Sequence, residues 1–510
     1  MQPSSKLVLL RGVPLSNTYT MSTIYESREG QYADFMSYPH IELENLSYQR
    51  FNENIIRIDR NVEEVYDVNY IIFSNDAYSL DFVRYFYAFV TDVEYINDNT
   101  TAIHYEIDVI QTWMFDYEFG DCLIEREHVA DDTVGKHVLG EGFNIGEYVI
   151  TNKTELKGEN LIYCAYISDI EGTNMKGVGG IEPPKVRGAV PVSCYSIALG
   201  LGPAAVPKLK ELVDAAGKDG KLDSIVCVFG VPQQFASPND SIKSQELAIA
   251  GKALTFTPKN NKMYTYPYCY ATIEGGNERK TLLYEKMGQG CVLSILGGFG
   301  PNMTVVGIPT FYDNTTVYMD GAVTCSGYPM LAWVGNYYQN WLAQKTPHYQ
   351  ARAFTSVAKA ATSAVGASVV GGIPGAIAGG VMSLANDIVN VWQEDATAQM
   401  IPDKLSGSVN ATDILATTGQ LGFRTYCMSV RADVGQAIDD FFTMYGYKVQ
   451  RLGKPHLMQR PNFNYIKMAN TVLLGTLNNN DFESIQRIYS NGICFWKQLS
   501  KVGNYTINNK

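Results

Sequence analysis

The chain has 510 residues, a length that predicts two to four domains, and its 46% hydrophobic and 18% charged residues are the balance of a globular protein. The net charge is −12 and no Lys/Arg run occurs, which argues against site-specific nucleic-acid binding, because such binding needs cations to neutralise phosphates. An acidic chain can still pass DNA without retaining it, since like charges repel. The 34 Tyr residues suit either the strands of a β-rich protein or subunit interfaces.

The cysteines indicate the compartment in which the chain is made. There are nine, an odd number, scattered along the sequence without a C-x-x-C pair. This pattern predicts neither a disulfide framework nor a zinc site, and it suits a reducing cytoplasm. The apolar run that follows Lys6 is too short for a signal peptide, so we expect none.

The first 130 residues are predicted to be β-rich. Tyr85, Tyr87, Phe89, Val93 and Tyr95 are expected on one side of a strand that ends in a polar turn at residues 97–100. A second alternating run follows over residues 103–109. Two such runs around a short polar turn predict a β-hairpin with one buried face.

The middle of the chain reads as a mixed α/β region followed by a return to strands. Residues 131–190 are glycine-rich and irregular, and we expect a small α/β domain to extend to about residue 255. The expected elements are strands over residues 161–168 and 225–231, a helix over 206–216 with Pro207 near its start, and strands over 264–273, 292–296 and 304–311.

The last hundred residues predict an α+β region. Apolar residues at helical spacing over 434–445, followed by Gly446, indicate a helix and its C-terminal stop. Strands are expected beside Tyr447 and Phe463. A second helix is expected to begin at Asn480, with Glu483 completing a capping box, and to end at Asn491-Gly492 with Ile485, Ile488 and Tyr489 on its apolar side.

One segment departs from this globular pattern. Residues 360–386 carry no charged side chain and are dominated by Ala, Gly, Val and Ser. Pro374 would break a single helix through the segment at a cost of about 3 kcal/mol, so two helical arms around a break are expected. Each arm is shorter than the roughly 20 apolar residues that span a bilayer.

Three interpretations of this segment remain open from composition alone. It is a helical hairpin buried in a soluble core, an ordinary transmembrane anchor, or a segment that is packed away at first and inserted into a membrane later. Small residues favour close helix packing in lipid, and backbone groups there must bond within helices or a closed barrel.

Candidate catalytic chemistry is weak throughout the chain. His104, Glu106 and Asp108 alternate on one predicted strand face, which permits a metal site or an acid/base pair, but the polar side of an amphipathic strand explains them better. The charged run at residues 125–128 is expected to be a solvated or salt-linked strand. No metalloprotease, nucleophile-elbow or P-loop motif is present. We therefore predict a protein that is not an enzyme and has no metal or cofactor.

Blocks of residues at both ends of the chain resemble the distal tail (knob) proteins of φ29-type short-tailed bacteriophages. The blocks occur in the family's order and approximate spacing and cover about half of the chain, thinning between residues 150 and 260. They are Tyr85–Thr91, His104–Val109, Gln111–Phe115, Ile124, Arg126–Val129, Tyr266–Cys269, Phe441-Phe442, Tyr445–Lys448, Lys454-Pro455, Phe463–Tyr465, Asn478–Asp481, Asn491–Ile493 and Gly503–Tyr505.

This resemblance implies a fold, an assembly and a function. The fold is mainly β with α+β parts, in which β-barrel-like tail-tube domains form a homohexameric ring and a long apolar loop is inserted late in the chain. The loops plug the tube, then leave it and penetrate the host cytoplasmic membrane so that double-stranded DNA passes during ejection. Implied partners are other copies, upper tail and collar proteins, and membrane lipids. The implied location is the virion tail tip, after synthesis in the host cytoplasm.

The resemblance also assigns boundaries and residues. The expected parts are an N-terminal β-rich tube domain (1–150), a middle α/β insertion (151–260), a second β-rich tube region (261–340), a hydrophobic membrane-active loop (341–405) and a C-terminal α+β region (406–510). Structural family-motif residues are Tyr87, Phe89, Glu106, Asp108, Trp113, Arg126 and His128. Membrane-active residues are Ala360, Val365, Val369, Val370, Gly371, Gly372, Ile373, Pro374, Gly375, Ile377, Val381, Met382 and Leu384.

Two other functions compete with this hypothesis. The aromatic-rich composition permits a host-receptor adhesin at the tail tip without membrane activity, which would bind host cell wall in the absence of lipid. A tail-associated wall hydrolase is the enzymatic alternative, and clearing of host peptidoglycan in a zymogram would identify it.

Overall fold

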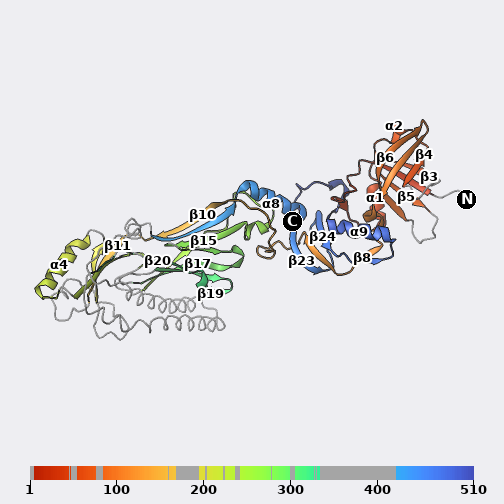
Figure 1. Cartoon of the computed structure of the whole chain (residues 1–510). Helices are drawn as coiled ribbons and strands as arrows, with labels where there is room; N and C mark the ends of the chain where they lie inside the picture. Colours follow the sequence, from red (N-terminus) through yellow and green to blue (C-terminus); the bar gives the residue numbers. More distant parts are fainter. Residues whose placement is uncertain are drawn as a thin grey trace. The chain divides into compact units, whose positions relative to one another are not determined.

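The computed structural model shows two compact units that share the chain unevenly (Figure 1). Unit 1 contains residues 1–144, 256–263 and 433–510, and unit 2 contains residues 145–255 and 264–432. The residues that the structure describes are 5–44, 46, 54–75, 84–158, 160–167, 195–201, 204–221, 224–235, 242–276, 278–298, 305–326, 328, 330–332 and 421–510.

Unit 1 begins with an antiparallel sheet whose strand order is β3-β1-β5-β6-β7-β4. Its strands are β1 (Ser5–Arg11), β3 (His40–Glu44), β4 (Ile55–Ile58), β5 (Val68–Asn75), β6 (Tyr85–Asn97) and β7 (Thr100–Ile107). All six strands contribute side chains to one hydrophobic cluster. The opposite face of β1, β5 and β6 packs against α1 (Arg28–Phe35). A short helix, α2 (Val62–Val65), lies between β4 and β5.

The predicted hairpin is confirmed, but its single buried face is not. β6 and β7 are joined by the turn at Asp98 and Asn99. Tyr87 and Phe89 pack in the cluster with α1, whereas Val93 packs on the other face of the sheet. The cause is a register shift between Val90 and Asp92, because one extra residue in a strand exchanges the two faces beyond it.

The second half of unit 1 is a sheet of order β2-β26-β24-β9-β23 covered by a helix. Its strands are β2 (Ser22–Thr23), β9 (Cys122–Glu127), β23 (Tyr447–Gly453), β24 (Phe463–Ala469) and β26 (Ile493–Trp496). A two-stranded extension joins β8 (Tyr117–Phe119) to β25 (Leu473–Gly475). The helices α3 (Val109–Trp113) and α9 (Asn479–Asn491) pack on this sheet through one hydrophobic cluster. The last element is the 3-10 turn η8 (Leu499–Lys501).

The helices of the C-terminal region confirm the sequence prediction, with one corrected start. α8 (Ala432–Tyr445) ends at Gly446, whose φ of 66° is the left-handed conformation that glycine adopts readily. α9 buries Ile485, Ile488 and Tyr489 as predicted. The capping box at Asn480 and Glu483 is wrong, because Asn478 is the N-cap and its side chain accepts a hydrogen bond from the backbone N–H of Asp481.

The described part of unit 2 contains three sheets and one α-helix. A sheet of order β10-β22-β15-β16 consists of β10 (Tyr148–Lys157), β15 (Cys269–Gly275), β16 (Glu278–Leu282) and β22 (Gly422–Val430). A second, of order β14-β17-β18-β19 with β20 paired to β18, consists of β14 (Ile242–Ala248), β17 (Met287–Gly298), β18 (Val305–Tyr312), β19 (Thr315–Val317) and β20 (Val323–Cys325). Side chains of both sheets form a common core. The short turns η6 (Tyr284–Lys286) and η7 (Met319–Gly321) flank these strands.

The third sheet of unit 2 packs against a helix. Its order is β12-β11-β13-β21, with β11 (Leu161–Ile167), β12 (Tyr195–Leu201), β13 (Ile225–Pro232) and β21 (Met330–Ala332). α4 (Ala205–Lys218) packs on it through Leu212 and Ala216. In Figure 1 this helix lies beside β11. The predicted strand over 264–273 starts later than expected, because η5 (Asn261–Tyr264) and a turn precede Cys269. The expected five-part division of the chain remains a prediction.

Candidate functional site

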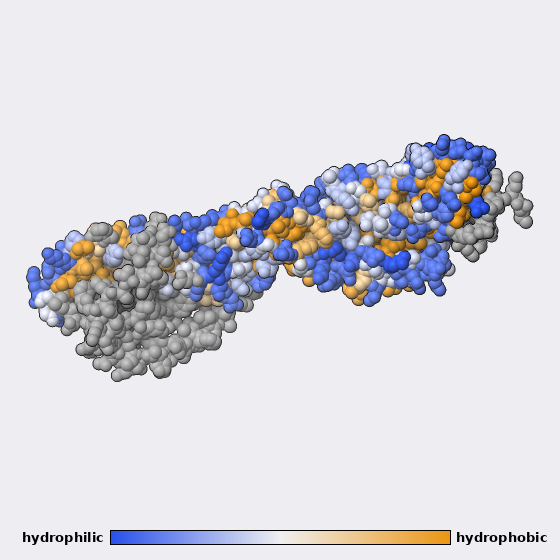
Figure 2. All heavy atoms as spheres, turned by 45° about the horizontal axis from the view of Figure 1, so that its top comes forward, coloured by the Kyte–Doolittle hydropathy of each residue, from blue (hydrophilic) through white to orange (hydrophobic). Residues whose placement is uncertain are grey.

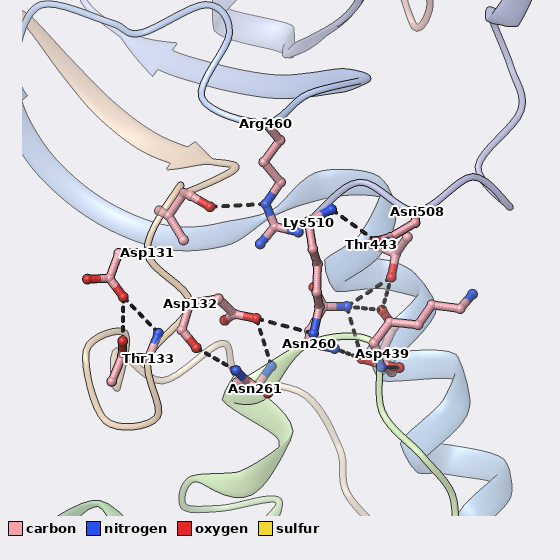
Figure 3. Close-up of polar contacts among 12 residues, drawn as sticks. Asp131, Asp132, Thr133, Asn260, Asn261, Asp439, Thr443, Arg460, Asn508 and Lys510 are labelled. Carbon is pink, nitrogen blue, oxygen red and sulfur yellow. Dashed lines mark hydrogen bonds and ion pairs between the residues drawn. The ribbon is translucent and has the colours of Figure 1, made fainter.

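Three chain segments far apart in sequence meet in unit 1, at a cluster of polar side chains that we call the polar junction (Figure 3). The segments are the end of β9 with the loop that follows it, the stretch from Lys259 into η5, and α8 with the start of β23. The residues of the junction are Arg126, Asp132, Glu141, Lys259, Asn260, Asn261, Lys262, Asp439 and Thr443.

On α8, Asp439 holds the stretch before η5 by four hydrogen bonds. Its carboxylate accepts from the backbone N–H of Lys259 at 2.7 Å and of Asn260 at 3.0 Å, and from Asn260 Nδ2 at 2.9 Å. Its backbone carbonyl accepts a further bond from Asn260 Nδ2 at 3.0 Å. Burial raises the pKa of Asp439, while these donors oppose the shift. These hydrogen bonds attach residues 259–260 to α8. Figure 3 shows Asn260 and Asp439 at this contact.

A buried ion cluster forms the second part of the junction. The Glu141 side chain is fully buried and lies between Lys262, at 2.5 Å, and Arg126. Arg126 also donates to the carbonyl of Gly446 at 2.7 Å. Burial lowers the pKa of Lys262, and the Glu141 carboxylate opposes that change. Removing one member would leave an uncompensated charge in the interior, so the cluster is a structural constraint that favours one arrangement of the three segments.

Next to this cluster, His128 is buried and neutral. Its Nδ1 accepts the backbone N–H of Tyr465 at 2.7 Å, and its Nε2 lies 3.0 Å from the carbonyl of Thr443, to which it donates. Burial and the positive charge of Arg460 lower the pKa of His128 to about 3. Both ring nitrogens are therefore used to join α8 and β24 to β9, and neither is free for proton transfer.

The preceding residue, Glu127, is paired with the edge strand of the sheet. Its carboxylate accepts two bonds from Arg451, at 2.6 and 3.0 Å, and one from Gln459 at 3.2 Å. A bidentate pair of this kind fixes both position and orientation. The predicted charged run at residues 125–128 is thus salt-linked, as expected, and part of it is buried.

Asp108 is the centre of a second polar cluster, between the two halves of unit 1. It is buried as the N-cap of α3, where its carboxylate accepts from the backbone N–H of Gln111 at 3.1 Å and from the hydroxyl of Tyr70 at 2.9 Å. Burial raises the pKa of Asp108 to about 6, against the effect of these donors. The neighbouring strand β6 contributes Tyr87, whose carbonyl accepts the backbone N–H of Asp108 at 2.8 Å.

The remaining family-motif residues have separate positions. Phe89 is buried, with its ring edge-on to that of Tyr70. Trp113 Nε1 donates to Asp481 at 2.8 Å and so connects α3 to the start of α9. Glu106 is exposed on β7, 3.5 Å from Asn17 Nδ2.

The shared strand face expected for His104, Glu106 and Asp108 is wrong, because Asp108 has left the strand to cap α3. His104 pairs instead with Glu94 at 3.1 Å. Within the described ranges, no three His, Cys, Asp or Glu side chains are grouped as metal ligands would be.

The predicted membrane-active residues, from Ala360 to Leu384, lie outside the described residues. Of the helices in the described ranges, none has both the length and the apolar composition needed to cross a bilayer. Apolar side chains do reach the surface in both units, interspersed with hydrophilic ones (Figure 2).

Sequence reasoning found part of this site. The family resemblance points to Arg126 and His128, but nothing in the sequence points to Glu141, Lys262 or Asp439. Glu141 and Lys262 are 121 residues apart, and nothing in the local pattern of either predicts their contact.

The polar junction connects chain segments that are far apart in sequence, and comparison with known proteins identifies the family to which the chain belongs. Residues 233–510 match the family described as the C-terminal domain of the tail knob protein gp9 of Bacillus phage phi29. The chain belongs to this family. Residues 3–118 also match the N-terminal region of the caudoviral major tail protein family.

Whole-chain relatives extend the match beyond the C-terminal half. The tail knob protein gp9 of Bacillus phage PZA is 24% identical, and that of Bacillus phage phi29 is 23% identical, each over 98% of both chains. The solved structure of the bacteriophage C1 tail knob protein, gp12, superposes with a TM-score of 0.63 at 12% identity, covering 99% of this chain and 98% of that one, which shows a common fold.

These findings confirm the predicted family and the coarse function. The protein is a structural component of a phage tail knob, located in the virion, and its relatives are tail knob proteins. The mainly β fold with α+β parts is confirmed in the described residues.

Proposed function

We propose that this protein forms the distal end of a short phage tail tube as a homohexamer, and that residues 341–405 form its membrane-active loop. Six loops close the tube before infection, are released at the host, and penetrate the cytoplasmic membrane so that double-stranded DNA passes without sequence-specific contacts. Upper tail and collar proteins hold the other end of the tube.

The observation that carries this proposal is the uncharged stretch at residues 360–386 in a chain that belongs to the tail knob family. Apolar surface is stabilised by removal from water at about 25 cal/mol per Å². Loops that pack against one another in a closed tube remove their apolar side chains from water. After release, the hydrocarbon core of the membrane removes the same side chains from water. The same residues therefore suit both states.

The junction and the family-motif residues have a supporting part in this proposal. A tube wall under the pressure of passing DNA must keep its chain segments in fixed positions. Tyr87, Phe89, Asp108, Trp113, Arg126 and His128 are proposed to do so in unit 1, through the hydrogen bonds and ring contacts described above.

The test separates assembly from membrane activity. Full-length protein, a variant lacking residues 355–392, and Val369→Asp are compared by negative-stain microscopy and by dye release from lipid vesicles. Val206→Asp is the matched control, because Val206 is 65% exposed on α4. All four should form rings with six-fold end views. The deletion should abolish dye release, and Val369→Asp should reduce it about a hundredfold, since a charge at the centre of a membrane helix costs about 3 kcal/mol.

Each part of the proposal has its own contrary outcome. Dye release that survives the deletion would show that the loop is not the membrane-active part. Particles without six-fold symmetry in the full-length sample would exclude the hexamer. Binding of the deletion variant to lipid-free host cell wall, with no dye release from any sample, would favour the receptor adhesin.

A further inference from the structure

Two thiols from neighbouring strands meet in the interior of unit 2. Cys269 is the first residue of β15 and Cys427 lies in β22. The register pairs Cys269 with Ser429 and Ala271 with Cys427, so the two cysteines are two positions apart on the same face of the antiparallel pair. Their sulfur atoms are 3.6 Å apart, and both side chains are fully buried.

The surroundings of the two sulfurs are unequal. The backbone N–H of Ala253 donates to Cys427 Sγ at 3.3 Å, and the Tyr284 ring packs beside the pair. The thiol of Cys269 donates to Cys427, which together with these groups lowers the pKa of Cys427 to about 5, while the pKa of Cys269 is raised. Of the two thiols, Cys427 therefore ionises more readily than Cys269.

No comparable pair occurs among the other cysteines whose side chains the structure describes. Cys122, Cys164, Cys291, Cys325 and Cys494 are free thiols without a sulfur neighbour in hydrogen-bond contact. Burial raises the pKa of Cys291 and Cys325 to about 11 and that of Cys494 to about 12. These thiols remain protonated and unreactive at neutral pH.

We propose that Cys269 and Cys427 are an oxidisable pair that stays reduced in the host cytoplasm and is closed to a disulfide by peroxide in the released virion. The Cys427 sulfur attacks one oxygen of hydrogen peroxide, the O–O bond breaks, and the leaving hydroxide takes the proton of Cys269 to form water. The Cys269 sulfur then attacks the sulfenic acid on Cys427, the S–O bond breaks, and the second oxygen leaves as hydroxide, which takes up the proton that Cys427 released to solvent when it ionised. Two thiols and one peroxide give one disulfide and two waters.

The consequence is a covalent connection between strands that are 158 residues apart in the chain. The sulfurs must approach from 3.6 Å to the roughly 2.05 Å of an S–S bond. Because diagonal positions of an antiparallel pair are about 7–8 Å apart, closure also requires β15 and β22 to move closer together at this point. The disulfide closes a long loop and so reduces the number of conformations open to the unfolded chain. The oxidised protein should therefore unfold at a higher temperature.

Peptide mapping of the full-length protein tests the proposal directly. Protein purified with reductant is freed of it, treated with hydrogen peroxide, denatured in acid with a thiol-blocking alkylating agent, and digested without reduction. We expect a cross-linked peptide joining Cys269 to Cys427, two thiols fewer per chain, and an upward shift of the thermal unfolding midpoint that reductant reverses.

Substitutions separate this pair from general oxidation. Cys494→Ser, which removes a buried thiol of unit 1, should still lose two thiols, whereas Cys427→Ser should lose none. Cys269→Ser should stop at a sulfenic acid on Cys427, which dimedone labels. The proposal fails if both cysteines of the untreated sequence remain alkylatable after peroxide, or if they oxidise no faster than Cys494. The mapping of the unsubstituted protein decides the question even if a variant does not fold.

Discussion

His128 should make unit 1 sensitive to acid, by an amount that follows from its burial. An unfolded histidine takes up a proton near pH 6.5, whereas the folded side chain stays neutral until its pKa of about 3. Between these values the unfolded state binds the additional proton, so the stability that His128 contributes is complete above pH 6.5 and is lost as the pH falls. Linkage gives a loss of about 2 kcal/mol between pH 7.5 and pH 5.

Urea unfolding at several pH values measures this loss. His128→Gln keeps an amide that can both donate and accept but cannot be protonated, so its free energy of unfolding should fall about 2 kcal/mol less than that of the unsubstituted chain over this interval. His456→Gln changes an exposed ring and is the matched control. Parallel pH dependences for the unsubstituted chain and His128→Gln would refute the assignment of a buried neutral imidazole.

Asp108 should act in the opposite direction: its folded pKa of about 6 lies above the unfolded value, so its contribution is complete below pH 4 and decreases by about 3 kcal/mol as the pH rises through 6. Asp108→Asn should remove that decrease in the same urea titration, and an unchanged slope would contradict it. Glu141→Gln leaves Arg126 and Lys262 without their counter-ion and should cost about 3–5 kcal/mol. Lys153→Gln, which breaks an exposed pair on β10, should cost less than about 1 kcal/mol, and equal losses would show that the buried cluster contributes nothing special.

Elements whose signal is local were predictable from the sequence. The hairpin of β6 and β7, α4 and α8 were found because apolar periodicity and turn residues are read within a short window. Which face each side chain occupies depends on contacts with residues that are distant in the sequence. The bulge between Val90 and Asp92 has no sequence signature here, and it transfers Val93 to the other face of the sheet.

The polar residues that the sequence places wrongly also depend on contacts with distant parts of the chain. Asn478 and Asn480 both lie at the start of α9, and either is a good N-cap by type. The choice of Asn478 follows the hydrogen bond from Trp113 to Asp481, which places the first turn of the helix against α3. The buried partners of Arg126 come from loops with no periodicity, so only the folded chain reveals them.

The discontinuity of unit 1 has a consequence for how the protein is made. Its second sheet requires β9 from the early part of the chain and β23, β24 and β26 from the last part, with all of unit 2 translated between them. During synthesis on the ribosome, β9 therefore has neither of its partner strands until β23 has been made, after more than half of the polypeptide has followed it. Completion of this sheet is therefore a late event that follows the synthesis of unit 2.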